Sequence, residues 1–291
     1  MSTYVISDIH GNLRALQALL VEIDFKYDGR DKLYLLGDYV DWGPDSIATL
    51  EYVINLDTLP FVKCIIGNHD LMFLEEIVKN RTHSKVRDNN WLFNNRGLDT
   101  WAQYVALPEE SQDLIYEWLR KLPYAQETYV KRHWYLLCHA GAYLPQKKRY
   151  VNSEELEGDK LYAVWHRIES GDEDPLTNLY ERYPHHTWKK RRYERLICGH
   201  TVSVRYTKLA PGEPYRIYKG DKFINIDCGA KCMGLIPNRE YVPASTILSG
   251  RLAALRLDDM AEFYVDRDQA GYTEIYKDME DTELNHDYID D

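Results

Sequence analysis

The stretch Leu35-Leu36-Gly37-Asp38-Tyr39-Val40-Asp41-Trp42-Gly43-Pro44 decides the fold class that this sequence predicts. The apolar run 33–36 is typical of a buried strand, and because it stops at Gly37, Asp38 comes at the carboxyl end of that strand. In α/β proteins, ligands bind at this edge of a sheet. The turn residues Gly37, Gly43 and Pro44 allow Asp38 and Asp41 to face the same space. A lone turn of this composition is most often structural, so support must come from other segments.

Four other segments repeat this design, because each is a short apolar strand that ends in residues of metal-ligand type. They are residues 4–12, 62–70, 134–141 and 196–201. The six candidate metal ligands at the strand ends are Asp8, His10, Asp38, Asn68, His139 and His200. Mixed nitrogen and oxygen ligands suit Mn, Fe or Zn better than Mg. Six ligands are too many for one tetrahedral ion, so they favour two divalent ions that share a bridging carboxylate.

The composition limits the classes of protein to which this chain can belong. Its 291 residues, 44% of them hydrophobic, can form a sizeable core in one large domain or two small ones. A net charge of -11 makes the chain a poor general binder of nucleic acid backbones. No apolar run is long enough to span a membrane, and the start leads directly into a strand without a signal peptide, so we expect a cytoplasmic protein.

The five cysteines fit a reducing compartment. Cys64, Cys138 and Cys198 lie inside apolar strands, a position typical of small buried thiols rather than disulfides. Cys228 and Cys232 are too isolated to suggest a zinc site.

The order of the expected elements favours a parallel sheet in the first half of the chain. Strands are expected at 4–7, 32–36 and 61–66, separated by a helix that Asn12 caps and by a helix from about Ser46. Residues 70–121 have a helical pattern, and we expect them to cover one side of the site.

The second half is expected to be more antiparallel. Further strands are expected at about 128–138, 195–198, 222–227 and 246–257. The polar segment 145–192 indicates a loop-rich insertion with a short helix near 161–169. The last residues, 278–291, hold seven Asp or Glu side chains and no Lys or Arg, which is typical of a solvated tail.

The ordered motifs resemble the calcineurin-like metallophosphoesterase superfamily, and within it the phosphoprotein phosphatase family. The matching blocks stand at 7–11, with Ser7 in place of glycine, and at 37–43, 67–70, 139–141 and 199–201. The blocks 223–229 and 251–255 also resemble bacterial members, and the likeness covers residues 4 to about 265. It implies a four-layer α/β/β/α sandwich of two mixed sheets with a helical insertion covering the site. It also implies a catalytic domain at 1–265, followed by an acidic tail at 266–291.

The resemblance implies a role for each matching residue. Asp8 and His10 would hold one metal ion with Asp38, which would bridge to a second ion held by Asn68, His139 and His200. A hydroxide held by the two ions would attack phosphorus. His69 matches the family's general acid and would be oriented by Asp41.

Position 42 departs from the protein phosphatases, in which an arginine at this place grips the phosphate. Trp42 has one donor and no charge, so it either packs against the helical cover or forms a wall for an aromatic or nucleobase group. Arg167 resembles a second phosphate-binding arginine of bacterial members, and Arg96 is a weaker candidate. The basic runs 147–149 and 189–192 are either solvated faces or flanks of a cleft for polyanionic substrates, and His185 and His186 are expected at the surface.

Three functions fit these observations. The first is a metal-dependent phosphomonoesterase of the Ser/Thr protein phosphatase type. The second is hydrolysis of a dinucleoside polyphosphate, of the diadenosine tetraphosphate type, or of another nucleotide. The third is a non-catalytic protein that binds a phosphorylated partner, although the intact ligand set and His69 argue against it. The expected partner in every case is a phosphorylated molecule rather than a membrane or nucleic acid.

Overall fold

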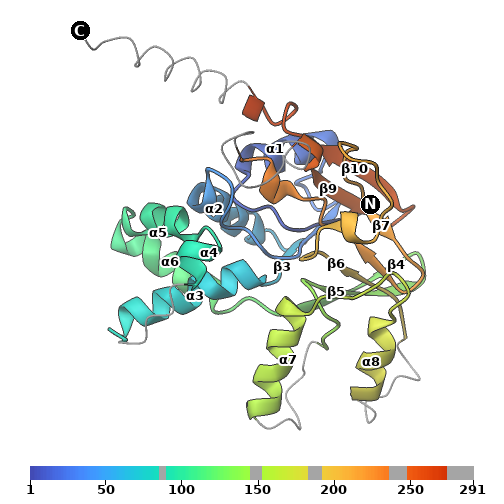
Figure 1. Ribbon diagram of the computed structural model, residues 1–291, viewed down its shortest axis with the longest axis horizontal. Coiled ribbons are helices and arrows are strands. Elements are labelled where there is room, and N and C mark those ends of the chain that lie inside the picture. Colours follow the sequence, from blue (N-terminus) through green and yellow to red (C-terminus); the bar gives the residue numbers. More distant parts are fainter. Residues whose placement is uncertain (85–89, 145–152, 183–191, 236–247, 274–291) are drawn as a thin grey trace.

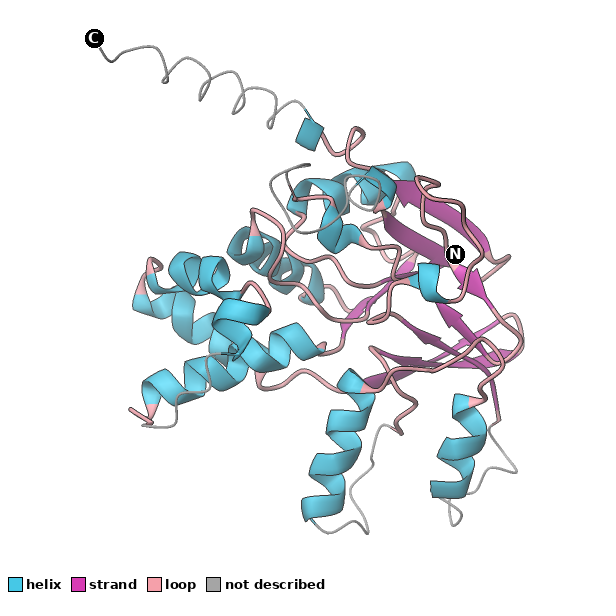
Figure 2. Ribbon diagram, viewed as in Figure 1, coloured by secondary structure: helices cyan, strands magenta, loops and turns pink. Residues whose placement is uncertain are grey.

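The computed structural model describes residues 1–84, 90–144, 153–182, 192–235 and 248–273, and two five-stranded sheets form its centre (Figures 1 and 2). The strand order of the first sheet is β10-β9-β1-β2-β3. Its strands are β1 (Thr3–Ile6), β2 (Lys32–Leu35), β3 (Val62–Cys64), β9 (Leu252–Arg256) and β10 (Ala261–Val265). The strands β1, β2 and β3 run parallel, whereas β9 is antiparallel to both of its neighbours, so this sheet is mixed.

The second sheet is also mixed and has the order β4-β5-β6-β8-β7. Its strands are β4 (Ala125–Val130), β5 (His133–Cys138), β6 (Tyr193–Cys198), β7 (Tyr218–Lys219) and β8 (Phe223–Asn225). The central strands β5, β6 and β8 are parallel, and β4 and β7 pair antiparallel at the two edges.

The alternation of side chains along the strands places the two sheets face to face. Val5 and Leu36 from the first sheet pack in one apolar cluster with Leu137, Ile197 and Ile224 from the second. The opposite face of the first sheet, including Ile6, is covered by α1 (Leu13–Glu22) and α2 (Ser46–Asp57). The side chains that α1 buries against this face are Ala15, Leu16, Leu19 and Leu20.

The outer face of the second sheet is covered by a separate pair of helices. Leu136 and Phe223 pack with Ala163 of α7 (Ser153–Trp165) and Leu176 of α8 (Pro175–Arg182). The layers therefore run helix, sheet, sheet, helix, as Figure 1 shows. This arrangement confirms the expected four-layer sandwich of two mixed sheets.

The predicted helical insertion lies between β3 and β4 and forms a group beside α2 (Figure 1). Its helices are α3 (Asn68–Arg81), α4 (Asn90–Asn94), α5 (Gly97–Val105) and α6 (Glu109–Leu119). The ring centroids of Trp118 in α6 and of Tyr39 in the loop after β2 lie 5.6 Å apart, so an aromatic contact joins the insertion to this loop. Within the insertion, Trp91 stacks on Phe73 with ring centroids 5.5 Å apart.

Two expectations about strands were wrong. The segment 128–138 is not one strand but the antiparallel pair β4 and β5, joined at Lys131 and Arg132, whose φ angles are 49° and 73°. A two-residue turn with both φ values positive usually carries Asn or Gly, and neither marks this one. The strand β10 was not anticipated, and β9 begins only at Leu252, whereas residues 246 and 247 lie outside the described part.

Two expectations about helices were also wrong. The segment 145–192 holds two helices, and α7 ends at Trp165, so Arg167 follows the helix. Asn12 makes no side-chain bond that caps α1. Its amide instead donates to the carbonyl oxygens of Ile9, His10 and Ala230, at 2.8, 2.8 and 3.0 Å. The polar side chain therefore ties two loops together instead of closing the helix.

The core continues beyond the expected domain boundary, since Ala270 and Tyr272 are buried against the first sheet and its helices. The division at 265 stays a prediction, and residues 274–291 of the acidic tail lie outside the described residues. Residues 147–149, His185, His186 and residues 189–191 of the basic run 189–192 also lie outside the described part of the chain. All five cysteines are buried free thiols. None of the described helices is long and apolar enough to cross a membrane.

Candidate metal centre

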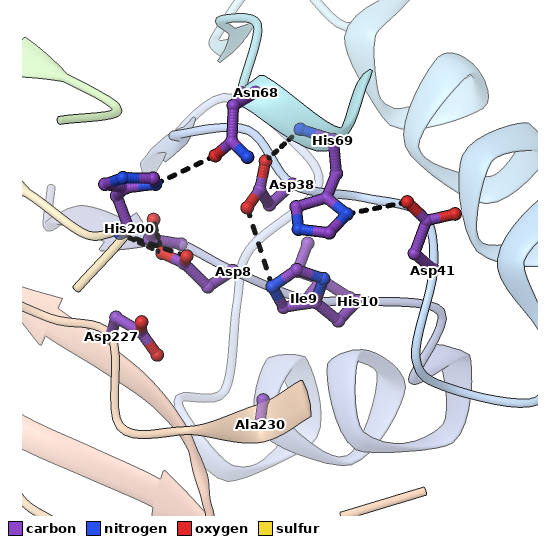
Figure 3. Close-up of polar contacts among 12 residues, drawn as sticks. Asp8, Ile9, His10, Asp38, Asp41, Asn68, His69, His200, Asp227 and Ala230 are labelled. Carbon is purple, nitrogen blue, oxygen red and sulfur yellow. Dashed lines mark hydrogen bonds and ion pairs between the residues drawn. The ribbon is translucent and has the colours of Figure 1, made fainter. Parts of the chain in front are cut away.

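The six candidate ligands come together where the two sheets meet, and Figure 3 shows most of them around one space. Each follows the carboxyl end of a parallel strand, because these ends point to the same edge of their sheets. All six side chains are buried: Asp8, His10, Asp38, Asn68, His139 and His200. Buried polar groups need partners, so this cluster has a cost that only specific interactions can offset.

Asp38 is at the centre of the cluster. Its Oδ2 lies 3.5 Å from Nε2 of His10 and 3.4 Å from Nε2 of His139. Ligand atoms of Asp38, His10 and His69 lie within 4.8 Å of one another, and so do those of Asp38, His139 and His200. Asp38 thus belongs to two adjacent groups that could each hold a metal ion.

The hydrogen bonds of the histidines leave nitrogen lone pairs for an ion. Nδ1 of His10 faces the carbonyl of Val40 at 3.1 Å, and Nδ1 of His139 faces that of Leu36 at 2.8 Å. Both rings therefore direct Nε2 toward Asp38, in the way that outer hydrogen bonds orient metal-binding imidazoles. Buried Nε2 of His200 has no hydrogen-bond partner among the described residues. These donors fit divalent metal ions.

The ionisation of the histidines is set by burial and by Asp38. Burial lowers the pKa of His10 to about 3 and that of His200 to about 2, so both rings are neutral, as metal ligands must be. Burial also acts to lower the pKa of His139, but the carboxylate of Asp38 outweighs it and raises this pKa to about 10. Opposed shifts of this size among neighbouring groups are typical of functional sites.

Asn68 and Asp8 occupy different places in the cluster. Oδ1 of Asn68 lies 3.0 Å from Nε2 of His139 and 2.8 Å from Nδ1 of His200, within the second group. The carboxylate of Asp8 belongs to neither group, and its oxygens accept the backbone N–H of His200 at 3.0 and 3.1 Å. Asp227, which no sequence motif had assigned to the site, lies close enough to raise the pKa of Asp8 further after burial has raised it. The ligand role of Asp8 stays a prediction.

The backbone at the site is strained. Asp8, His10, Asp38 and His200 have φ angles of 53°, 49°, 55° and 66°, in the left-handed region that non-glycine residues rarely adopt. Each such residue costs on the order of 1–3 kcal/mol, and such residues cluster at functional sites. The fold therefore maintains this arrangement against its local cost.

Two glycines allow the loops to approach the carboxylates. A Cβ at Gly67 would lie 2.2 Å from Oδ1 of Asp38, and one at Gly199 would lie 1.9 Å from Oδ2 of Asp8. No side chain fits in either space. The glycines in the motifs at 67–70 and 199–201 are thus required by close packing against candidate ligands.

His69 and Asp41 form a buried pair beside the metal groups, as Figure 3 shows. Nδ1 of His69 lies 2.6 Å from Oδ2 of Asp41. The same carboxylate accepts Nε1–H of Trp91 at 2.7 Å and the hydroxyl of Thr100 at 2.6 Å. Burial acts to lower the pKa of His69, but the carboxylates of Asp38 and Asp41 outweigh it and raise this pKa. His69 can therefore carry a proton near neutral pH.

Several residues of this site were not predicted from the sequence. Asp70 accepts the backbone N–H groups of Asp38, Tyr39 and Gly67 at 2.8, 2.9 and 2.9 Å, and so joins two ligand loops. Asp70 stands three residues after Gly67, the N-cap of α3, where an acidic side chain commonly accepts backbone N–H groups. This position in the sequence could therefore have predicted its role. Trp91 and Thr100 carried no such signal, because only the packing of the insertion brings them to Asp41.

The expected substrate-binding residues lie at different distances from the centre. Trp42 is half-buried, and the guanidinium of Arg96 lies 5.3 Å from its ring centroid. Arg167 is exposed, but its charge reaches His200, since it adds to the lowering of that pKa after burial and His139. The structure thus brings Arg96 to Trp42 and leaves Arg167 near the opposite group of ligands.

Comparison with known sequences agrees with this geometry. A sequence model of calcineurin-like phosphoesterases matches residues 1–204. A symmetrical bis(5'-nucleosyl)-tetraphosphatase from Shewanella sp. strain MR-4 is 33% identical over 171 residues, which are 56% of each chain. A relative of the same name from Cellvibrio japonicus is 36% identical over 143 residues, 48% of this chain and 45% of its own. The matched part spans about half the length of these relatives.

Solved structures share the fold at low sequence identity. A protein serine/threonine phosphatase from Saccharomyces cerevisiae superposes with a TM-score of 0.53 at 16% identity, covering 88% of this chain and 72% of its own. A protein provisionally described as a diadenosine tetraphosphatase has a TM-score of 0.50 at 19% identity, covering 91% and 93%. Because the sequence model matches residues 1–204, this chain belongs to the calcineurin-like phosphoesterase family.

Proposed function

We propose that this protein is a hydrolase of phosphate esters and anhydrides that uses two divalent transition-metal ions. The observation that carries the proposal is the position of Asp38, whose carboxylate belongs to two adjacent groups of ligands. His10 and Asp8 would complete the first site with Asp38, and Asn68, His139 and His200 would complete the second. Bound ions would supply a nucleophile at neutral pH and neutralise charge on the phosphoryl oxygens.

The chain itself would supply the proton for the leaving group. His69 is held by Asp41 at 2.6 Å and faces the same space as the ligands, with its ring centroid 4.9 Å from that of His10. The carboxylate fixes the ring and stabilises its protonated form, which is the form that a general acid needs. Asp41 is itself held by Trp91 and Thr100, so the pair is preorganised.

We further propose a dinucleoside polyphosphate as the substrate. The names of the relatives support this choice, and so does the absence of an arginine at position 42. A phosphoserine or phosphothreonine protein is the second candidate. The buried His69–Asp41 pair favours it, because a serine or threonine alkoxide leaves only with a proton, whereas a nucleoside diphosphate is a better leaving group.

A substrate panel tests both proposals. The Mn-loaded protein would be assayed on diadenosine tetraphosphate, a phosphoserine peptide and p-nitrophenyl phosphate, with Asp38→Asn as the inactive control and metal content measured in parallel. We expect metal-dependent hydrolysis with the highest kcat/KM for the dinucleotide. A higher kcat/KM for the peptide would select the second candidate, and no hydrolysis of any substrate by protein that holds two ions would refute the hydrolase.

A further inference from the structure

Lys231 lies beside the candidate metal centre, although no family motif includes it. It belongs to the short 3-10 helix Ala230–Cys232, which follows β8 and Asp227. Its Nζ lies 5.5 Å from the ring centroid of Trp42, the residue that follows Asp41. Within the described part of the chain, its ammonium group makes no hydrogen bond or ion pair, so it is available to a ligand.

The segment that carries Lys231 is held against the site by the side chain of Asn12 and by close backbone packing. The amide of Asn12 donates to the carbonyl of Ala230 at 3.0 Å, and Asn12 also holds the carbonyl of His10. Figure 3 shows Ala230 in this position below His10. A Cβ at Gly234 would lie 2.9 Å from Cα of Gly43, so the chain after Lys231 packs closely on the loop that carries Trp42. Lys231 is therefore placed by tertiary contacts and not by a free loop.

The charge of Lys231 reaches the centre. Burial is the main cause of the low pKa of His10, and the ammonium of Lys231 contributes to lowering it. Burial raises the pKa of Asp227, and Lys231 partly opposes this rise. The ammonium thus lies near both the first group of metal ligands and a buried carboxylate.

Trp42 is in contact with two cations. The guanidinium of Arg96 at 5.3 Å and the ammonium of Lys231 at 5.5 Å both lie within the range of cation–π attraction. An indole in contact with two cations is less available for stacking on a nucleobase. The indole instead limits the positions that the guanidinium of Arg96 and the ammonium of Lys231 can adopt. These two cations bring positive charge to the place where protein phosphatases carry an arginine.

We propose that Lys231, held with Arg96 by the indole of Trp42, binds a phosphate next to the one that is attacked, so that the site selects a phosphate chain over a single phosphoryl group. This inference rests on the proposed hydrolase function and assigns its specificity to a residue outside the family motifs. It replaces the base-stacking role for Trp42 with that of a support for cations.

The test compares Lys231→Gln with Lys131→Gln. Lys131 is an exposed residue in the turn before β5, at the opposite end of that strand from His139. The assays are kcat/KM on diadenosine tetraphosphate and on p-nitrophenyl phosphate. A third measurement is calorimetric binding of a methylene-bridged triphosphate, which has no base and whose P–C–P links no hydrolase cleaves. Trp42→Phe keeps an aromatic ring at position 42 and tests whether this side chain positions the two cations.

We expect Lys231→Gln to weaken binding of the triphosphate and kcat/KM on the dinucleotide by about tenfold, the effect of losing one bond between charged groups. Turnover of p-nitrophenyl phosphate should change less than about twofold, since it has no second phosphate. Trp42→Phe should lie between Lys231→Gln and the wild type, because phenylalanine attracts cations less strongly. Lys131→Gln should match the wild type in every assay.

Other outcomes overturn the inference. Unchanged binding of the triphosphate would show that Lys231 does not touch the phosphate chain. Equal losses on both substrates together with a lower Tm would mean that Lys231 serves only to balance the buried charge of Asp227. If the wild type hydrolyses nothing but Lys231→Gln still weakens triphosphate binding, the proposed hydrolase function fails and the phosphate site stands.

Discussion

Asp41 provides the sharpest test of how the site is built, because asparagine and alanine should have opposite consequences there. One carboxylate oxygen accepts from His69 and Trp91, and the other accepts from Thr100. In Asp41→Asn, the carbonyl oxygen can keep the first two bonds while the amide donates to the hydroxyl of Thr100. That hydroxyl can then donate to Oγ of Ser46, which is 2.9 Å away. Every buried group keeps a partner.

Asp41→Ala leaves two of these donors without a partner. Thr100 can turn to Ser46, but the N–H groups of His69 and Trp91 are buried and lose their acceptor. At about 1–3 kcal/mol for each unsatisfied buried group, the free energy of unfolding should fall by roughly 2–6 kcal/mol. For Asp41→Asn, a loss of about 1 kcal/mol or less is expected, since only the strength of the bonds changes.

The catalytic effect of Asp41→Asn should be large despite its small effect on stability. Loss of the negative charge lowers the pKa of His69, because the Asp41 carboxylate is one of the groups that raise it. A hydrogen bond to a charged group is worth about 1.5–3 kcal/mol, so transfer of the proton to an alkoxide should slow roughly tenfold to a hundredfold. A nitrophenolate needs no proton, and its release should hardly change.

Denaturant unfolding of both variants measures the predicted difference in stability. The predicted kinetic effect is measured as kcat/KM on glycerol 2-phosphate and on p-nitrophenyl phosphate. Two results would refute the reasoning. Equal destabilisation by asparagine and alanine would mean that the bonds to Trp91 and Thr100 do not form. Equal kinetic losses on both phosphates would mean that His69 does not donate the proton.

Three further predictions concern metal binding and stability. Asp38→Asn should reduce the metal content from two equivalents to one or fewer under saturating Mn, because one charge serves both groups of ligands; two retained equivalents would contradict this. Gly199→Ala should also lower metal content and stability, since its Cβ would lie 1.9 Å from Oδ2 of Asp8, and unchanged elemental analysis and Tm would disprove the packing argument. Gly158→Ala is the matched change, because its Cβ would meet nothing within 4 Å on the exposed side of α7. It should raise the free energy of unfolding by about 0.5–1 kcal/mol with full metal content, and a loss of stability would be inconsistent with that environment.

Local signals in the sequence were enough to predict a parallel sheet in the first half of the chain and the set of candidate ligands, whereas the four-layer sandwich was implied by the family resemblance. The apolar run at 33–36 and the helical pattern of residues 70–121 are properties of neighbouring residues, and they indicate which segments form buried strands and helices. The stop at Gly37 places Asp38 at a strand end, and the carboxyl ends of parallel strands lie at one edge of a sheet. Residues far apart in the chain, such as Asp38 and His139, could therefore be expected to meet.

Only the tertiary structure decided which partners the candidate residues have. The turn at Lys131 and Arg132 lacks turn residues, so the pairing of β4 with β5 was set by the sheet and not by local propensity. Trp91 reaches Asp41 across 50 positions of sequence, and Lys231 reaches Trp42 across the two halves of the chain. Such contacts depend on how the insertion and the second sheet pack against the first. This packing cannot be predicted from the periodicity of a single segment, because that periodicity specifies only which face of the segment is buried.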